Sequence, residues 1–138
     1  MSEENVELIH RGVAAFNSGG FEAVDGVFWS DDIVWDTTPA GIPGLGIYRG
    51  RAEVRKFFEE DWFGAFPFDE WELTAEEVLD CGDDRVVSLI RQHGRGATSG
   101  AGVEMEFAQV ITLRDGKVVQ VDTYLDREKA LSAAGLSE

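Results

Sequence analysis

Two chemically versatile side chains, Arg91 and His93, follow two apolar ones in the stretch VVSLIRQHGRG, residues 86–96. The stretch predicts a β-strand, in which alternate side chains share a face, so that Arg91 and His93 continue the face of Val87 and Leu89. An imidazole can act as a general base near neutral pH, and a guanidinium can stabilise negative charge that develops on an oxygen. We therefore predict that both residues form the polar end of an internal site, with His93 as the general base. The alternative is a structural histidine beside a rim arginine.

Polar residues also interrupt the apolar faces of three further predicted strands. In each strand one polar residue shares a face with a large hydrophobic neighbour: Thr37 with Trp35, Gln109 with Phe107, and Thr123 with Val121. An unpaired polar group inside a packed core costs about 1 to 3 kcal/mol, so we expect these residues to converge on a cavity instead. A mostly apolar pocket with a few polar groups is typical of a small-molecule site. We predict that all six residues bind the substrate.

The composition limits the class of protein. The chain has 138 residues, which suits one domain over residues 1–138. Its formal net charge of −15 repels phosphate, so we expect neither nucleic acid nor a membrane as a partner. Cys81 is the only cysteine, and no segment is typical of a signal peptide or a membrane span. We expect a cytoplasmic protein.

The sequence contains none of the motifs that usually mark a metal, nucleotide or covalent site. The glycines of residues 44–50 have the wrong spacing for a dinucleotide loop, and this stretch lacks the lysine of a phosphate loop. There is no Gly-x-Ser-x-Gly, no helical pair of histidines and no second cysteine. We expect no cofactor and no metal, and we interpret residues 38–50 as a surface loop or pocket lid.

The elements that must position these residues follow from the apolar spacing. Three- and four-residue spacing predicts helices at residues 3–17, 21–28, 51–63 and 127–134, the last of them capped by Asp126. Alternation predicts strands at 33–37, 70–74, 86–96, 103–113 and 117–125. We predict that a three-residue loop, 114–116, joins the last two strands and sets Gln109 opposite Val121 and diagonal to Thr123. The alternative, a two-residue loop at 115–116, would set the two apolar faces against each other.

Several short motifs resemble those of the SnoaL-like, ketosteroid isomerase-related domains of the nuclear transport factor 2-like superfamily, over nearly the whole chain. These motifs are AFNSGG at 15–20, DDIVW at 31–35, YRG at 48–50, RDGKVV at 114–119 and YLD at 124–126. The resemblance implies an α+β fold shaped as a cone, with a curved antiparallel sheet wrapped around three helices and a pocket inside. The superfamily holds isomerases, hydrolases, cyclases and plain binding proteins, so fold does not imply one activity.

The known chemistries of the family are only partly matched. The tyrosine, base aspartate and protonated aspartic acid of ketosteroid isomerases fall at Gly12, Thr37 and Gln109. The resemblance to limonene epoxide hydrolases keeps their arginine at Arg91 but places their two aspartates at His93 and Thr123. The base of SnoaL-type cyclases also falls at Thr123. An arginine, an imidazole and neutral groups remain.

We expect a protein that binds a small, largely apolar molecule in the pocket. If it is an enzyme, it acts as a cofactor-independent isomerase, cyclase or epoxide hydrolase by His-based proton transfer or water addition, with Arg91 and Gln109 stabilising charge. The alternative is a non-catalytic binding or oligomerisation domain. An apolar outer sheet face predicts a homodimer; its residues are Val86, Ile90, Ala108, Val110, Val118 and Tyr124.

Overall fold

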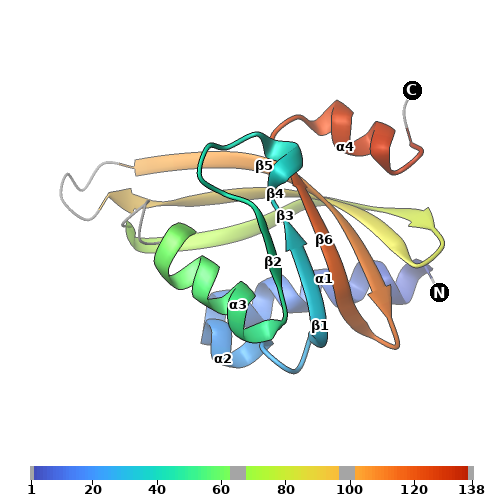
Figure 1. The fold of residues 1–138 in the computed structure, drawn as a ribbon, viewed down its shortest axis with the longest axis horizontal. Coiled ribbons are helices and arrows are strands. Elements are labelled where there is room, and N and C mark those ends of the chain that lie inside the picture. Colours follow the sequence, from blue (N-terminus) through green and yellow to red (C-terminus); the bar gives the residue numbers. More distant parts are fainter. Residues whose placement is uncertain (1, 63–67, 97–101, 137–138) are drawn as a thin grey trace.

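Six strands form one curved sheet in the order β2-β1-β6-β5-β4-β3 (Figure 1). The computed structural model describes residues 2–62, 68–96 and 102–136. The strands are β1 (Trp29–Asp36), β2 (Ile47–Arg49), β3 (Phe68–Gly82), β4 (Arg85–Gly96), β5 (Gly102–Arg114) and β6 (Lys117–Tyr124). β1 and β6 run parallel and the other neighbours antiparallel, so the sheet is mixed and not purely antiparallel as predicted. The predicted α+β cone with a curved sheet around helices is confirmed.

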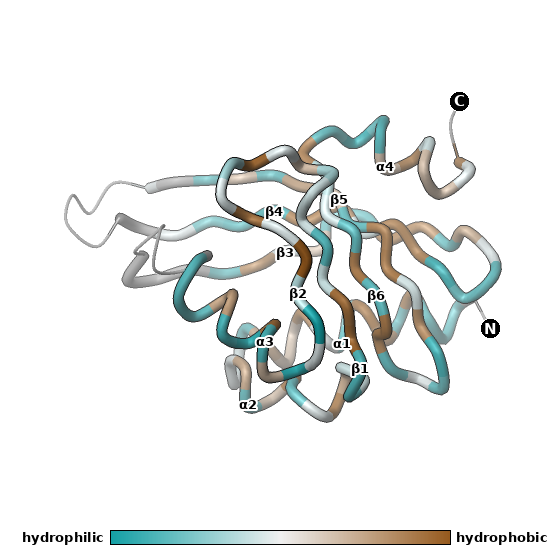
Figure 2. The backbone as a smooth tube through the Cα atoms, in the orientation of Figure 1, coloured by the Kyte–Doolittle hydropathy of each residue, from teal (hydrophilic) through white to brown (hydrophobic). Residues whose placement is uncertain are grey.

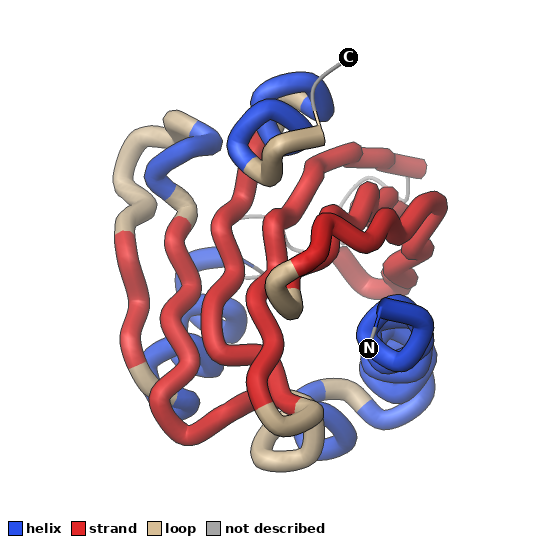
Figure 3. Tube along the Cα trace, turned by 90° about the vertical axis from the view of Figure 1, so that its right-hand side faces the viewer, coloured by secondary structure: helices blue, strands red, loops and turns tan. Residues whose placement is uncertain are grey.

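The N-terminal helices and the C-terminal helix lie on opposite faces of the sheet. The helices are α1 (Ser2–Gly19), α2 (Phe21–Val24), α3 (Arg51–Lys56) and α4 (Arg127–Ala133), and α3 continues as a π-helical turn, η2 (Phe57–Trp62). Figure 3 shows α1 inside the curve of the sheet and α4 on its convex side. Asp126 caps α4 as predicted, because its carboxylate accepts a hydrogen bond from the Glu128 N–H at 2.8 Å.

A glycine turn joins α1 to α2. The Gly20 N–H donates to the Phe16 carbonyl at 2.8 Å, and its φ of 66° lies in the left-handed region that glycine adopts at little cost. This turn brings Phe21 against Phe16, with ring centroids 5.2 Å apart. The two helices therefore contribute to one aromatic surface that faces the sheet.

The segment predicted to be a surface loop or pocket lid, residues 38–50, is joined to the rest of the fold by backbone pairing and side-chain contacts. It contains a 3₁₀ turn, η1 (Thr38–Ala40), and β2, which pairs with β1. The Tyr48 ring stacks on Phe57 with centroids 4.3 Å apart. Both the N–H and the hydroxyl of Thr37 donate to the Gly46 carbonyl, at 3.0 and 2.7 Å. The loop prediction is therefore confirmed over residues 41–46, whereas β2 was missed because it forms only by backbone pairing with β1.

The hairpin between β5 and β6 combines a two-residue turn with a bulge. Asp115 and Gly116 have φ values of 54° and 76°, as in the primed turns that favour hairpins. Arg114 pairs with Lys117, but the pairing shifts between Thr112 and Leu113, which leaves Val119 as an extra residue. The predicted three-residue loop was wrong. The bulge nevertheless makes odd-numbered residues of β5 pair with odd-numbered residues of β6, as the prediction required.

The outer face of the sheet is partly covered by α4. Figure 2 shows hydrophobic and hydrophilic segments interspersed along the strands of the sheet. Of the predicted dimer face, Val86, Ile90 and Val118 point inward, whereas Ala108, Val110 and Tyr124 lie on the outer face in a cluster with Ala130 and Leu131 of α4. Only three of the six residues predicted for the dimer face therefore lie on the outer face of the sheet, and the homodimer itself stays a prediction.

Candidate functional site

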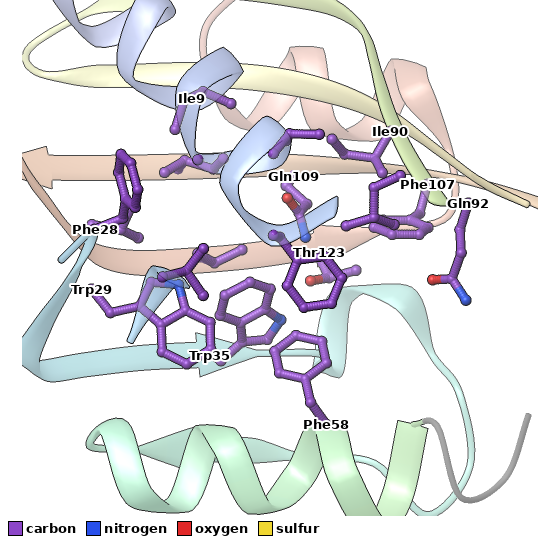
Figure 4. A pocket seen from close by; sticks show the side chains of 18 of the residues that line it. Ile9, Phe28, Trp29, Trp35, Phe58, Ile90, Gln92, Phe107, Gln109 and Thr123 are labelled. Carbon is purple, nitrogen blue, oxygen red and sulfur yellow. The ribbon is translucent and has the colours of Figure 1, made fainter. Parts of the chain in front are cut away.

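A cavity of about 150 Å³ lies between the concave face of the sheet and the helices (Figure 4). α1, α2 and η2 close it on one side, and β1, β4, β5 and β6 on the other. Aromatic side chains supply much of the wall: Phe16, Phe21, Phe28, Trp29, Trp35, Phe57, Phe58 and Phe107. Such a concave, largely apolar space suits a small organic molecule.

Contacts between the rings hold the aromatic wall in place. Trp35 meets Phe58 edge-on with ring centroids 4.8 Å apart, and meets Trp29 at 5.9 Å. Phe58 also contacts Phe21 of α2, with centroids 5.7 Å apart. Offset and edge-to-face pairs of this kind are favourable beyond the area that they bury. The wall thus joins β1, η2 and α2 into one packed surface.

A row of polar side chains crosses the inner face of the sheet. Ser88 of β4 pairs with Gln109 of β5, and Gln109 pairs with Thr123 of β6. Ser88 is 0% and Thr123 6% exposed, and neither hydroxyl has a hydrogen-bonding partner in the part of the chain that the structure describes. Gln109 and Thr123 line the cavity, whereas Ser88 lies one strand behind Gln109. The cavity therefore has a polar patch at Gln109 and Thr123 in a largely apolar wall.

Two further polar side chains line the cavity. The Thr37 hydroxyl donates to the Gly46 carbonyl at 2.7 Å, so its proton is already used. Gln92 of β4 is 1% exposed and lies beyond Phe107 in Figure 4. Both can present acceptors, and Gln92 can also present an amide N–H.

No described residue that lines the cavity carries an ionisable side chain. General acid–base catalysis needs a group that can take up or release a proton within hydrogen-bonding reach of the substrate. The described wall offers a bound molecule hydrogen-bonding groups and shape. The described part of the chain contains no group of three or more His, Cys, Asp or Glu side chains that could hold a metal ion.

A family model described as SnoaL-like domain matches residues 9–121. The chain belongs to the SnoaL-like domain family. The family predicted from the sequence motifs is thereby confirmed.

Solved structures show the same fold at low sequence identity. Bal32a, from a soil-derived mobile gene cassette, is 24% identical with a TM-score of 0.71, covering 89% of each chain. TerC, co-crystallised with polyporic acid, is 22% identical with a TM-score of 0.72, covering 96% of this chain and 98% of that one. AclR from Streptomyces galilaeus, a putative hydroxylase, is 22% identical with a TM-score of 0.71 and 98% coverage of both chains. Comparison with curated proteins gives no match.

The structure places all six predicted substrate-binding residues of this SnoaL-like domain on the cavity wall: Trp35, Thr37, Phe107, Gln109, Val121 and Thr123. The bulge in β6 sets Gln109 directly opposite Thr123, two residues away from the predicted pairing with Val121. The residues are therefore brought together as expected, and their role in binding stays a prediction.

Arg91 and His93 lie on the outer face of β4, away from the cavity. The residues of β4 that line the cavity are Ile90 and Gln92, so the predicted parity of this strand was wrong. The physical reason is that Val86 and Val87 are both fully buried, one in the inner core and the other against the α4 cluster. A strand that is covered on both faces carries apolar residues on both, so its sequence does not show which face points inward.

The surroundings of Arg91 and His93 are acidic and partly exposed. The Arg91 guanidinium lies 2.9 Å from Glu76 and 3.1 Å from Glu106, and the charge of Glu76 is the main cause that raises the pKa of Arg91. His93 Nε2 lies 3.4 Å from Glu72 Oε1, and the His93 side chain is 40% exposed. Arg91 therefore belongs to a group of surface ion pairs and His93 contacts a surface carboxylate, which corrects their predicted place in the site.

Ser88 and Gln92 are the residues of the polar row and the wall that sequence reasoning missed. Both lie on the face of β4 opposite to the one predicted to point inward. The cross-strand pairing of Ser88 with Gln109 is the signal that would have identified them, since both side chains must share a face.

A separate group of ionisable side chains lies on the outer face where β1 and β6 meet. Burial raises the pKa of Asp122, and the Asp36 carboxylate raises it further, while a hydrogen bond donated by Gln120 at 2.8 Å lowers it. Burial also raises the pKa of Tyr124, with Asp122 as a further cause. These groups do not touch the cavity.

None of the helices in the described part of this SnoaL-like domain is long and apolar enough to cross a membrane.

Proposed function

We propose that this SnoaL-like domain binds a small, largely apolar molecule in the internal cavity and holds it by shape and a few hydrogen bonds. The observation that carries the proposal is the combination of an aromatic wall, one buried polar row and the absence of ionisable side chains from the described lining. A ligand that buries most of its surface against such a wall gains hydrophobic free energy in proportion to the apolar area buried.

The chemistry of the wall favours binding over catalysis by His93. An isomerase, cyclase or epoxide hydrolase that used His93 as its base would need the imidazole within reach of the ligand. His93 instead contacts Glu72 on the outer face of β4. The co-crystallisation of TerC with polyporic acid supports an organic ligand for a cone of this kind.

A catalytic role is the second candidate, and the unpartnered Thr123 hydroxyl beside Gln109 is the observation that favours it. Two adjacent hydrogen-bonding groups can hold a water molecule against a bound ligand. If that water added to the ligand, an atom of the ligand would accept the proton that the water releases, because the described wall has no ionisable side chain.

The experiment that tests binding is a titration of the ¹⁵N-labelled protein with small neutral cyclic compounds, followed by amide chemical shifts. Binding in the cavity is expected to move the amide signals of α1, β5 and β6, including those of Gln109 and Thr123. Shifts that cluster instead around Arg91 and His93, or no shifts with any compound, would count against the proposal. The His93→Ala variant is the matched control, because its cavity wall is unchanged.

A homodimer and a cytoplasmic location are separate proposals that rest on the sequence. α4 covers Ala108 and Val110 of the predicted interface, which leaves the half-buried Leu89 and Tyr124 at its margin. A dimer through this face would therefore use the margin of the α4 cluster. Light scattering at micromolar concentration measures the mass directly, and a monomer would contradict the proposal.

A further inference from the structure

We propose that the row Ser88–Gln109–Thr123 recognises one oxygen-bearing group, a carbonyl or a hydroxyl, on an uncharged ligand of about one ring. This inference rests on the proposed function, since it names the chemistry of the molecule that the cavity holds. Gln109 and Thr123 contact the ligand, and Ser88 lies behind Gln109 in the same row.

The polar row is confined to one level of the sheet. Ser88, Gln109 and Thr123 are neighbours across β4, β5 and β6 in a single register row. The next inward pair in β5 and β6 is Ile111 with Val121, and both of these side chains are buried and apolar. A ligand over this row therefore meets the hydrogen-bonding groups of Gln109 and Thr123 with apolar side chains beside them.

The hydroxyl of Thr123 has unused bonding capacity. It is buried, it lines the cavity, and it has no partner among the described residues. Thr37 provides a contrast within the same wall, because its hydroxyl already donates to the Gly46 carbonyl. A buried hydroxyl without a partner loses its hydration on folding, and a ligand oxygen within reach would restore a hydrogen bond.

The Gln109 side chain adds a second recognition element beside Thr123. A carboxamide offers both N–H donors and a carbonyl acceptor, and a hydroxyl offers one of each. Together they can donate to a ligand carbonyl, or donate to and accept from a ligand hydroxyl. Ser88, fully buried and paired with Gln109 in the register of β4 and β5, adds a third hydroxyl or amide group to the row behind Gln109.

The ligand is uncharged because the described wall has no countercharge. A charged group that leaves water for an apolar cavity loses its hydration. The described lining contains no carboxylate and no cationic side chain that could compensate for that loss. The aromatic wall could attract a cation through its ring faces, so a cationic probe belongs in the test.

The cavity size sets the size of the ligand. A volume of about 150 Å³ matches the cavities that accept one benzene-sized ring. Trp35 and Phe58 pack edge-on with ring centroids 4.8 Å apart and form one tightly packed side of this space. The packed rings therefore favour a ligand of one ring with small substituents.

Calorimetric titration with four compounds built on one ring tests these points: toluene, p-cresol, p-toluate and 4-methylbenzylamine. We expect p-cresol to bind about tenfold more tightly than toluene, a ratio equivalent to one net hydrogen bond, and the two charged compounds to bind more weakly than toluene. The Thr123→Val variant keeps the side-chain shape and is expected to lose most of the preference for p-cresol while retaining toluene. Thr112→Val, on the outer face of β5, is the matched control and should retain it.

Equal affinities of the wild type for p-cresol and toluene would overturn the inference and leave the proposed binding function standing. So would tightest binding of either charged compound, or a p-cresol preference that Thr123→Val retains. Binding of none of the four would overturn the proposed function and the inference together. The wild-type comparison needs no variant, so it decides the question even if Thr123→Val does not fold.

Discussion

Gln109 and Thr123 face each other across β5 and β6 on the inner face of the sheet, and the bulge at Val119 sets this pairing. Their positions follow from backbone pairing and not from a bond between their side chains. The polar patch is therefore present before any ligand enters. A site that is arranged in advance loses less conformational freedom on binding, which favours affinity.

Gly12 of α1 lines the cavity, and its substitution should separate stability from binding. A Cβ at Gly12 would meet the Phe28 ring at 3.7 Å, an ordinary contact. Gly12→Ala should stabilise the protein by about 0.5 to 1 kcal/mol, because glycine costs that much inside a helix, and should retain ligand binding. Gly12→Leu should fill part of the cavity and abolish p-cresol and toluene binding. Denaturant unfolding and calorimetry measure the two effects, and unchanged affinity in Gly12→Leu would show that the ligand binds elsewhere.

His93→Ala should leave ligand binding unchanged. The imidazole lies outside the cavity and pairs only weakly with Glu72 at 3.4 Å, with 40% of its side chain exposed. Exposed ion pairs contribute little, so we also expect the free energy of unfolding to change by less than about 0.5 kcal/mol. Thermal shifts with and without p-cresol check both points. A ligand-induced shift that disappears in His93→Ala would restore His93 to the site.

Much of the site could be predicted from the sequence where the alternation of a strand is clear. In β6, Val121 and Thr123 alternate with Gln120 and Asp122, so the inner face is unambiguous. The same clarity identified Gln109 in β5. The family could also be predicted, because its turn and strand motifs are local features of the sequence.

The inner face of β4 could not be predicted, because what covers its outer face is far away in the sequence. α4 begins at Arg127, about forty residues after Val87, and packs on the same cluster as Val87. Because residues 86–90 are covered on both faces, the sequence alone allows either the even-numbered or the odd-numbered residues to point inward. The bulge at Val119 escaped prediction for a similar reason, since its register is decided by the partner strand and not by the turn alone.

Removal of α4 should make the protein associate. A chain that ends at Leu125 would expose the outer apolar cluster, in which Val87, Ala108 and Val110 are nearly inaccessible in the full chain. Exposed apolar patches on a sheet favour contact with a second copy. Light scattering from 1 to 100 µM should show a higher mass for the truncated chain than for the full chain. Ser132→Ala, exposed on the same helix, should behave as the full chain, and equal masses at every concentration would contradict the prediction.

Asp122→Asn should stabilise the protein at neutral pH and much less at acid pH. Burial and the neighbouring Asp36 raise the pKa of Asp122 in the folded state, so the folded protein binds this proton more tightly than the unfolded chain does. Below the ordinary pKa of aspartate, about 3.9, both states are protonated and no cost arises. As the pH rises from the ordinary pKa through the raised folded pKa, ionisation of Asp122 costs folding free energy, and this cost is fully present above the folded pKa. Asparagine removes the charge and keeps an oxygen to accept from Gln120.

Urea unfolding of the wild type and of Asp122→Asn at pH 7 and pH 3.5 measures the effect. We expect a gain of a few tenths to about 1 kcal/mol at pH 7 that largely disappears at pH 3.5. Any loss of negative charge relieves some repulsion in a chain of net charge −15, so Asp61→Asn, at an exposed aspartate, is the matched control. Because Asp61 has no comparable burial, its substitution should give a smaller gain at pH 7. An equal gain in the two variants would show that overall charge, and not the surroundings of Asp122, sets the pH dependence.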